Sequence, residues 1–132
     1  MAGTITPDRV IAEVERIMSR PFEWGPCDCC SAACDVFAAL WGLDPMAAVR
    51  GYRGPIGAVR MMRRAGGLPA LAEGLAARAG FVTGHAIGGL ALARGRAGRR
   101  SLLICITPGI WAGKSKYGFA ILRNADRGWH LA

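Results

Sequence analysis

The fold is decided by residues 24–45, which read WGPCDCCSAACDVFAALWGLDP. Glycine and proline open the stretch, and Asp28 carries the short acidic side chain that is typical of a helix N-cap. From there to Trp41 apolar side chains repeat at helical spacing on two adjacent stripes, and Gly42 is the residue type that commonly follows a helix end. Because the apolar arc is wide, the stretch predicts a buried helix over about residues 29–41.

Outward from this helix, the chain divides into a helical first half and a strand-rich second half. Apolar spacing and Pro or Gly boundaries predict three more helices, at 7–20 (ended by Pro21), 56–65 and 69–79. Val59 and Met62 are expected to be the inward side chains of the third helix. Short alternating or apolar runs predict strands at 90–93, 101–107, 110–112, 117–122 and 128–131. The sequence therefore predicts one α+β domain over 1–132, with helices packed on a small antiparallel sheet.

Composition excludes several classes of protein. The 132 residues are 52% hydrophobic and 20% charged, which excludes a wholly disordered chain. No apolar run approaches the roughly 18 residues of a membrane helix, and charges at close spacing in residues 1–20 predict no targeting segment.

The net charge of +8 fits either a solvated arginine-rich surface or an acidic partner. Five cysteines, four of them within residues 27–34, favour a reducing compartment.

Cys29, at the start of the central helix, is the candidate nucleophile of this sequence. It follows the N-cap Asp28, so its sulfur lies in the field of the helix N-terminus, which carries about half a positive charge and free N–H groups. Such a field stabilises a thiolate, the nucleophilic form of cysteine. A nucleophile at a helix start before a sheet is also the layout of papain-like enzymes, in which a histidine from the sheet is the base.

The motif Trp-Gly-x-x-Asp-Cys, residues 24–29, resembles a small family of tailed bacteriophages and prophages that is itself similar to NlpC-type papain-like cell-wall peptidases. The resemblance continues through residues 40–45, 50–52, 66–67 and 128–129. It implies a papain-like arrangement at a phage tail tip, with phage tail proteins as partners. It further implies a hydrolase, a cysteine peptidase or amidase acting on peptidoglycan peptides, with Cys29 as nucleophile and Asp28 and Trp24 in support. The expected location is the virion tail, or the host cytoplasm during assembly.

The chain departs from that peptidase pattern in two places. Gly88-Gly89 stands where those enzymes have Gly-Asp, and the next strand begins Ser101-Leu102-Leu103-Ile104, with no histidine. His85, in a turn before the first predicted strand, is the candidate base that remains, and a solvated loop histidine is the other interpretation. The competing hypothesis is a catalytically inactive structural protein of the tail tip or of tail assembly.

The remaining cysteines and the basic loop have simpler interpretations. Cys30 and Cys34 share a helix face with apolar residues and are expected to pack in the core, as is Cys105 in its strand. A cysteine-ligated metal or iron–sulfur site is the alternative, but the four clustered cysteines lack the separated pairs of zinc sites, so no metal or other cofactor is expected. No nucleic-acid-binding module is recognisable. Arg94–Arg100 is expected to form a basic hairpin tip.

Overall fold

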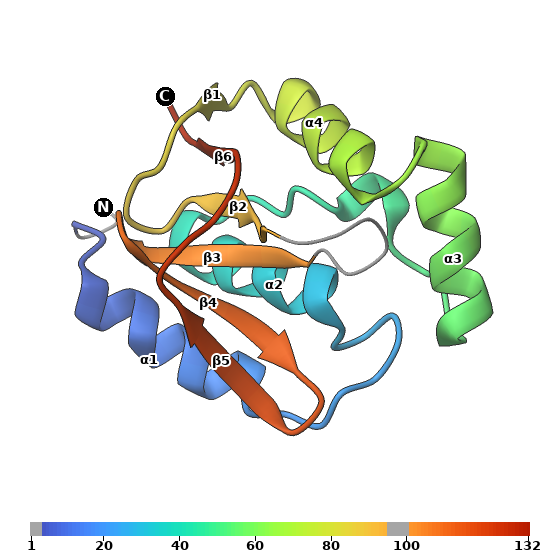
Figure 1. Cartoon of the computed structure of the whole chain (residues 1–132), viewed down its shortest axis with the longest axis horizontal. Coiled ribbons are helices and arrows are strands. Elements are labelled where there is room, and N and C mark those ends of the chain that lie inside the picture. Colours follow the sequence, from blue (N-terminus) through green and yellow to red (C-terminus); the bar gives the residue numbers. More distant parts are fainter. Residues whose placement is uncertain (1–3, 95–100) are drawn as a thin grey trace.

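The protein is an α+β structure in which four helices are followed by a six-stranded antiparallel sheet, and the sequence predicted this order and five of the six strands. The computed structural model describes residues 4–94 and 101–132. The helices are α1 (Pro7–Met18), α2 (Cys29–Trp41), the short 3₁₀ turn η1 (Ala47–Val49), α3 (Gly54–Ala65) and α4 (Leu68–Ala79) (Figure 1). The strands are β1 (Val82–Thr83), β2 (Leu90–Leu92), β3 (Leu102–Thr107), β4 (Ile110–Ser115), β5 (Gly118–Leu122) and β6 (Gly128–His130).

The sheet has the strand order β1-β6-β2-β3-β4-β5, and every pair is antiparallel. Strands β2 to β5 follow one another in space as in sequence. The last strand, β6, returns across the sheet and inserts between β1 and β2, where Trp129 lies opposite Leu90. Strand β1 is therefore joined to the other strands through β6.

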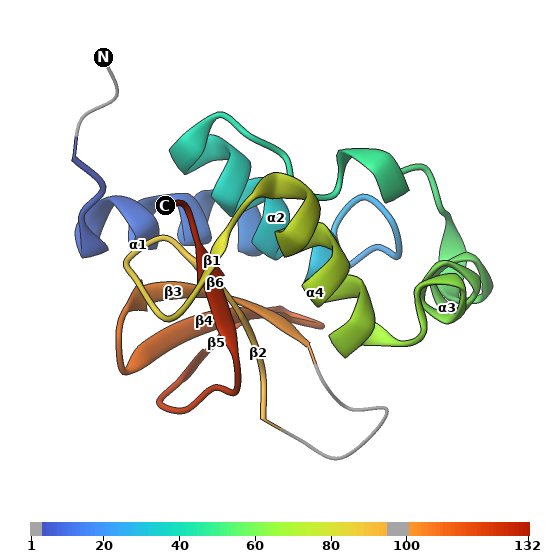
Figure 2. The ribbon, with the colours of Figure 1, turned by 90° about the horizontal axis from the view of Figure 1, so that it is seen from above.

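Helices α1 and α2 cover one face of the sheet, and this face carries the main core (Figure 2). Cys30, Cys34 and Phe37 of α2 are fully buried there, against strand residues such as Ile104. Alternate strand residues point to the other face, where a smaller cluster is formed by Ala91, Ala93, Leu103, Cys105 and Trp111. The predicted core positions of Cys30, Cys34 and Cys105 are thus confirmed, and the two faces are distinct environments.

Helix α3 lies at one end of the molecule, packed against α4 and away from the sheet (Figure 1). The prediction that Val59 faces inward is wrong, because its side chain is 51% exposed. Ala58 is the buried residue of α3, and Met61 and Met62 pack beside it against the main core. A helix that packs mainly against one other helix buries a narrower face than its periodicity alone suggests.

Other departures from the predicted elements concern their ends. Strand β4 continues to Ser115 rather than ending at residue 112, because β5 pairs along its whole length. Strand β1 was not predicted, since two residues carry no readable period. Strands β2 and β3 pair with Leu92 opposite Leu102, and residues 95–100 of the predicted hairpin tip lie outside the described residues. Among the described helices, none is long and apolar enough to cross a membrane.

Candidate functional site

The approach to α2 is a tight antiparallel turn that aims the chain at the helix start. Glu23 and Cys27 exchange two backbone hydrogen bonds of 2.9 Å, which close the turn. Gly25 sits inside it with a positive φ of 98°, a conformation that side chains disfavour. A Cβ at Gly25 would also collide with the carbonyl oxygen of Tyr52. The glycine of the Trp-Gly-x-x-Asp-Cys motif is therefore required both by its backbone conformation and by the lack of space.

The carboxylate of Asp28 accepts most of the hydrogen bonds of the site, and the residue is only 1% exposed. Its Oδ1 accepts hydrogen bonds from the backbone amides of Cys30 and Ser31, each at 2.9 Å, and from the Ser31 hydroxyl at 3.1 Å. The backbone amide of Asp28 in turn donates to Ser31 Oγ at 2.8 Å, which completes a capping box. The predicted N-cap is confirmed, and it fixes the direction of the first turn of α2.

Tyr52 is the residue of this site to which the sequence assigned no role. Its hydroxyl donates a 2.6 Å hydrogen bond to Asp28 Oδ2, which also accepts from the Gly25 amide at 2.9 Å. Burial, followed by this hydrogen bond, raises the pKa of Tyr52, so the phenol stays protonated as a donor. Its place in the segment Arg50-Gly51-Tyr52, part of the sequence resemblance, was the available signal.

The loop that carries Tyr52 is held by Arg50. This guanidinium contacts Asp44 through two hydrogen bonds of 2.7 and 3.2 Å and reaches Asp35 of α2 at 2.7 Å. Arg50 thus ties the segment after α2 to α2 itself. Because Tyr52 follows two residues later, the arginine and the tyrosine together fix this loop against the start and the middle of the helix.

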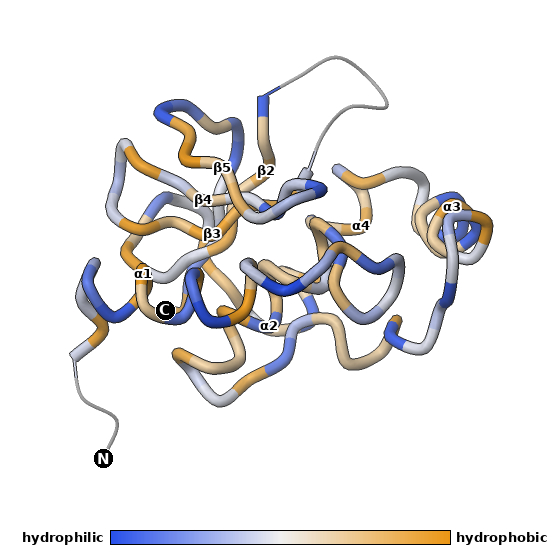
Figure 3. Tube along the Cα trace, turned by 90° about the horizontal axis from the view of Figure 1, so that it is seen from below, coloured by the Kyte–Doolittle hydropathy of each residue, from blue (hydrophilic) through white to orange (hydrophobic). Residues whose placement is uncertain are grey.

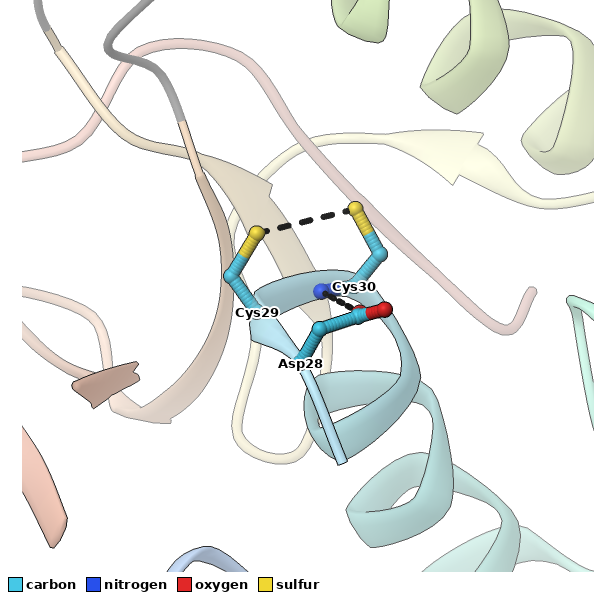
Figure 4. Close-up of side chains that lie close together, drawn as sticks. All are labelled: Asp28, Cys29 and Cys30. Carbon is cyan, nitrogen blue, oxygen red and sulfur yellow. Dashed lines mark hydrogen bonds between the residues drawn. The ribbon is translucent and has the colours of Figure 1, made fainter. Parts of the chain in front are cut away.

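Cys29 and Cys30 project their sulfurs side by side above the first turn of α2, 3.8 Å apart (Figure 4). The Cys29 thiol is half-buried, whereas Cys30 is fully buried. A hydrogen bond from the Cys30 thiol lowers the pKa of Cys29, and the backbone amides of Leu102 and Cys30 act in the same direction against burial and the Asp28 charge. The same contact and burial raise the pKa of Cys30. Cys29 is therefore the thiol of this pair whose ionised form is favoured.

The other thiols lie in apolar surroundings that favour the neutral form. Cys27, 4% exposed, points its sulfur at the carbonyl oxygen of Ile17, and burial raises its pKa. Burial also raises the pKa of Cys34, and it raises that of Cys105 to about 11. Cys29 thus differs from these three thiols both in exposure and in the direction of its pKa shift.

His85, the candidate base, is exposed and stacks edge-on against Trp111, with ring centroids 5.0 Å apart. Trp111 belongs to the small cluster on the face of the sheet opposite α2, whereas Cys29 packs on the helix side. In the part of the chain that the structure describes, no hydrogen bond joins Cys29 to a histidine. The contact of Cys29 with the Leu102 backbone instead places the start of β3, which lacks a histidine, beside its sulfur.

Trp24, expected to support the site, lies on the surface beside it. Its ring is 37% exposed and packs edge-on against Phe22, with centroids 4.9 Å apart. With Gly25, Pro26 and residues 50–54 it lines a cavity of about 790 Å³, whose lining does not include Cys29. The motif thus brings Asp28 and Cys29 together, while its tryptophan faces a neighbouring hollow.

Asp28, Cys29 and Cys30 are the group of three metal-ligating side chains that the described residues bring together, with donor atoms within 4.8 Å of one another. The carboxylate already accepts five hydrogen bonds, so ligation by Asp28 would break the helix cap. Two thiols remain, against the four ligands of a structural zinc site. The donor set therefore does not fit a cysteine-ligated zinc centre.

Comparison with known proteins adds a family but no described activity. A search of the curated proteins and a search of the solved structures each found no match to this chain. A family model matches residues 5–131, and that family is described as a domain of unknown function. The match spans both the helical half and the sheet, including the turn, the cap and the two thiols of the site. The chain is therefore a member of the DUF6950 family.

Proposed function

We propose that this chain is a tail-associated protein of a bacteriophage or prophage, built on an NlpC-type papain-like scaffold. In this proposal the site at Cys29 is a degenerate peptidoglycan peptidase or amidase site, which keeps the nucleophile and has lost the base. The observation that carries it is the half-buried Cys29 thiol at the N-terminus of a buried helix, with a lowered pKa. The α+β order of helices followed by an antiparallel sheet supports the scaffold.

The site is degenerate in this proposal because no general acid or base is positioned beside the Cys29 thiol. A Cys29 thiolate can add to a peptide carbonyl, and the amine must then be protonated before it leaves. In papain-like enzymes an imidazole supplies that proton, whereas His85 packs against Trp111 on the far face of the sheet. Losing a positioned general acid or base typically costs 10²- to 10⁴-fold in rate, roughly. Attack by the thiol is therefore retained and sustained turnover is not expected.

The thiol half of the proposal is tested by alkylation with iodoacetamide, followed for each cysteine by mass spectrometry across pH. Cys29 is expected to react fastest, with a midpoint below the value of about 8.5 of a free thiol. The midpoint matters more than the rate, because exposure alone would also favour Cys29 over the buried Cys27. A midpoint at or above that of glutathione, measured in the same way, would show that the Cys29 thiol is not activated and would contradict the proposal.

The missing base is tested with purified muropeptides, comparing wild type, Cys29→Ser and His85→Ala. We expect no sustained release of cleaved peptide from any of the three. Multiple turnover that Cys29→Ser abolishes would show a working peptidase and overturn the degenerate site. If His85→Ala also abolished that turnover, the sheet would have to rearrange to bring the imidazole to Cys29.

A catalytically inactive structural role is the second candidate, and the position of His85 favours it. The two are separated in a phage that encodes this chain, by introducing Cys29→Ala. Infectious particles at wild-type yield support a purely structural role, whereas assembled but poorly infectious particles support thiol chemistry at the cell wall. Mass spectrometry of purified tails tests whether the chain stays in the virion, and its absence from them would restrict it to assembly.

A further inference from the structure

A cavity of about 630 Å³ lies between η1, α3 and α4, and its lining shares Arg50 and Tyr52 with the network around Asp28. We call it the arginine pocket, after the four arginines of its lining, Arg50, Arg60, Arg64 and Arg78. Figure 3 shows α3 at the far end of the molecule, with hydrophilic and hydrophobic segments next to each other along the helix. The volume is within the range of ligand-binding clefts.

Three of the four arginines of the arginine pocket have no counter-charge in the described part of the chain. None of its lining residues is acidic. Arg50 is neutralised by Asp35 and Asp44, but Arg60, Arg64 and Arg78 form no salt bridge in the described part of the chain. Elsewhere on the surface Arg16 and Arg127 each pair with a glutamate. Three exposed guanidiniums around one cavity therefore lack a counter-charge.

The spacing of two of these arginines adds to the charge argument. Arg60 and Arg64 are one turn apart on α3, and like charges at that spacing repel each other. No acidic residue occurs anywhere in α3 to offset this. A bound anionic group would relieve the repulsion, because a guanidinium fork pairs with a carboxylate through two parallel hydrogen bonds.

The floor of the pocket decides between classes of anion. It is lined by aliphatic side chains, namely Val49, Met61, Leu71 and Leu75. Single-stranded nucleic acids are held by aromatic platforms on which bases stack. The one aromatic residue of the lining is Tyr52, whose hydroxyl is bound to Asp28. Aliphatic floors between helices instead suit the apolar side chains of an amphipathic peptide.

We propose that the arginine pocket binds an acidic amphipathic segment of a partner protein. The carboxylates of the segment pair with Arg60, Arg64 and Arg78, and its apolar side chains rest on the aliphatic floor. This inference does not depend on the chemistry of Cys29, because no residue of the pocket lining belongs to the thiol pair. Its failure would therefore leave the proposed function untouched, and the reverse also holds.

The test uses a fluorescein-labelled helical peptide with leucines on one face and glutamates on the flanks, and the same peptide with glutamine for glutamate. Binding to the full chain is measured by fluorescence anisotropy at low and high salt. The pocket variant is Arg60→Ser with Arg64→Ser. The matched control is Arg63→Ser with Arg123→Ser, two exposed arginines outside the pocket, so that both variants lose the same charge.

We expect the pocket variant to weaken binding about fivefold to tenfold, as two lost surface ion pairs would, and the control to change it less than twofold. The glutamine peptide should bind weakly, and the difference between the two peptides should shrink as salt rises. Met61→Ser should weaken binding while Val59→Ser, on the exposed side of α3, should not. Thermal melts check that each variant folds.

Three outcomes would overturn the proposal. Equal weakening in the pocket variant and its control would show attraction by net charge alone. Equal binding of the two peptides would remove the role of carboxylates. A single-stranded oligonucleotide that binds more tightly than the glutamate peptide, and loses that binding in the pocket variant, would make the pocket a nucleic-acid site instead.

Discussion

Cys29 and Cys30 are adjacent in the chain and in space, and the contact between their sulfurs lowers the pKa of Cys29 and raises that of Cys30. Removing the donor with Cys30→Ala should raise the pKa of Cys29, because that hydrogen bond is the largest cause of its lowering. The alkylation profile of Cys29 should then shift to higher pH, because the ionised sulfur loses its hydrogen-bond donor. The readout is the midpoint of the profile, measured by mass spectrometry.

The matched control for Cys30→Ala is Cys34→Ala. Cys34 is a fully buried thiol one turn further along the same face of α2, without a hydrogen bond to Cys29. Its removal should lower stability by a similar amount and leave the midpoint of Cys29 unchanged. A shift of equal size in both variants would mean that general loosening of α2, rather than the Cys30 thiol, controls Cys29.

At the scale of elements, the start of α2 depends on Asp28, which joins the helix to the turn before it and to the loop that carries Tyr52. Asp28→Ala removes the N-cap and leaves buried donors without an acceptor, so we expect a loss of about 3 kcal/mol or more. Tyr52→Phe removes one donor and should cost about 1 kcal/mol. Both free energies of unfolding are measured by urea denaturation.

Asp8→Ala is the comparison for the cap. Asp8 is an exposed acidic residue in the first turn of α1, where Thr6 rather than Asp8 is the cap. Its loss should cost only a few tenths of a kcal/mol, roughly, through the helix dipole. If Asp28→Ala lowered the free energy of unfolding as little as Asp8→Ala, the hydrogen bonds at the start of α2 would not contribute substantially to stability.

At the scale of the whole molecule, the buried thiols make stability depend on alkaline pH. An unfolded thiol ionises near pH 8.5, roughly, whereas burial raises the pKa of Cys34, and that of Cys105 to about 11. Above about pH 8.5 the thiols ionise in the unfolded chain but not in the folded protein, so unfolding releases protons. The stability from these groups is therefore fully present at neutral pH and is lost as pH rises above about 8.5. We expect the free energy of unfolding to fall by up to about 1.4 kcal/mol per pH unit for each such thiol.

Cys34→Ala should flatten this fall between about pH 8.5 and 10, which denaturant melts at several pH values would measure. Val36→Ala, at another fully buried position of α2, should lower stability at every pH and leave the slope as in wild type. The slope rather than the absolute stability is the test. An unchanged slope in Cys34→Ala would mean that this thiol ionises in the folded protein as readily as in the unfolded chain.

The sequence by itself determined the features that depend on neighbours along the chain. The Asp28 cap, the Gly42 end of α2 and the core positions of Cys30 and Cys34 follow from capping chemistry and helical period. The order of helices before a sheet follows in the same way from a change of period. These signals are local, so they can be read without knowing what each element packs against.

Only the tertiary structure decided the contacts between distant segments. Tyr52 meets Asp28 across 24 positions of sequence, and no local pattern predicts that pairing. His85 could be read as a base until the sheet placed it with Trp111, on the opposite side from Cys29. Val59 faces solvent because α3 packs mainly on α4, through its other side. The physical reason is common to all three: periodicity says which face of an element is apolar, while the arrangement of the elements decides what that face and the side chains beside it meet.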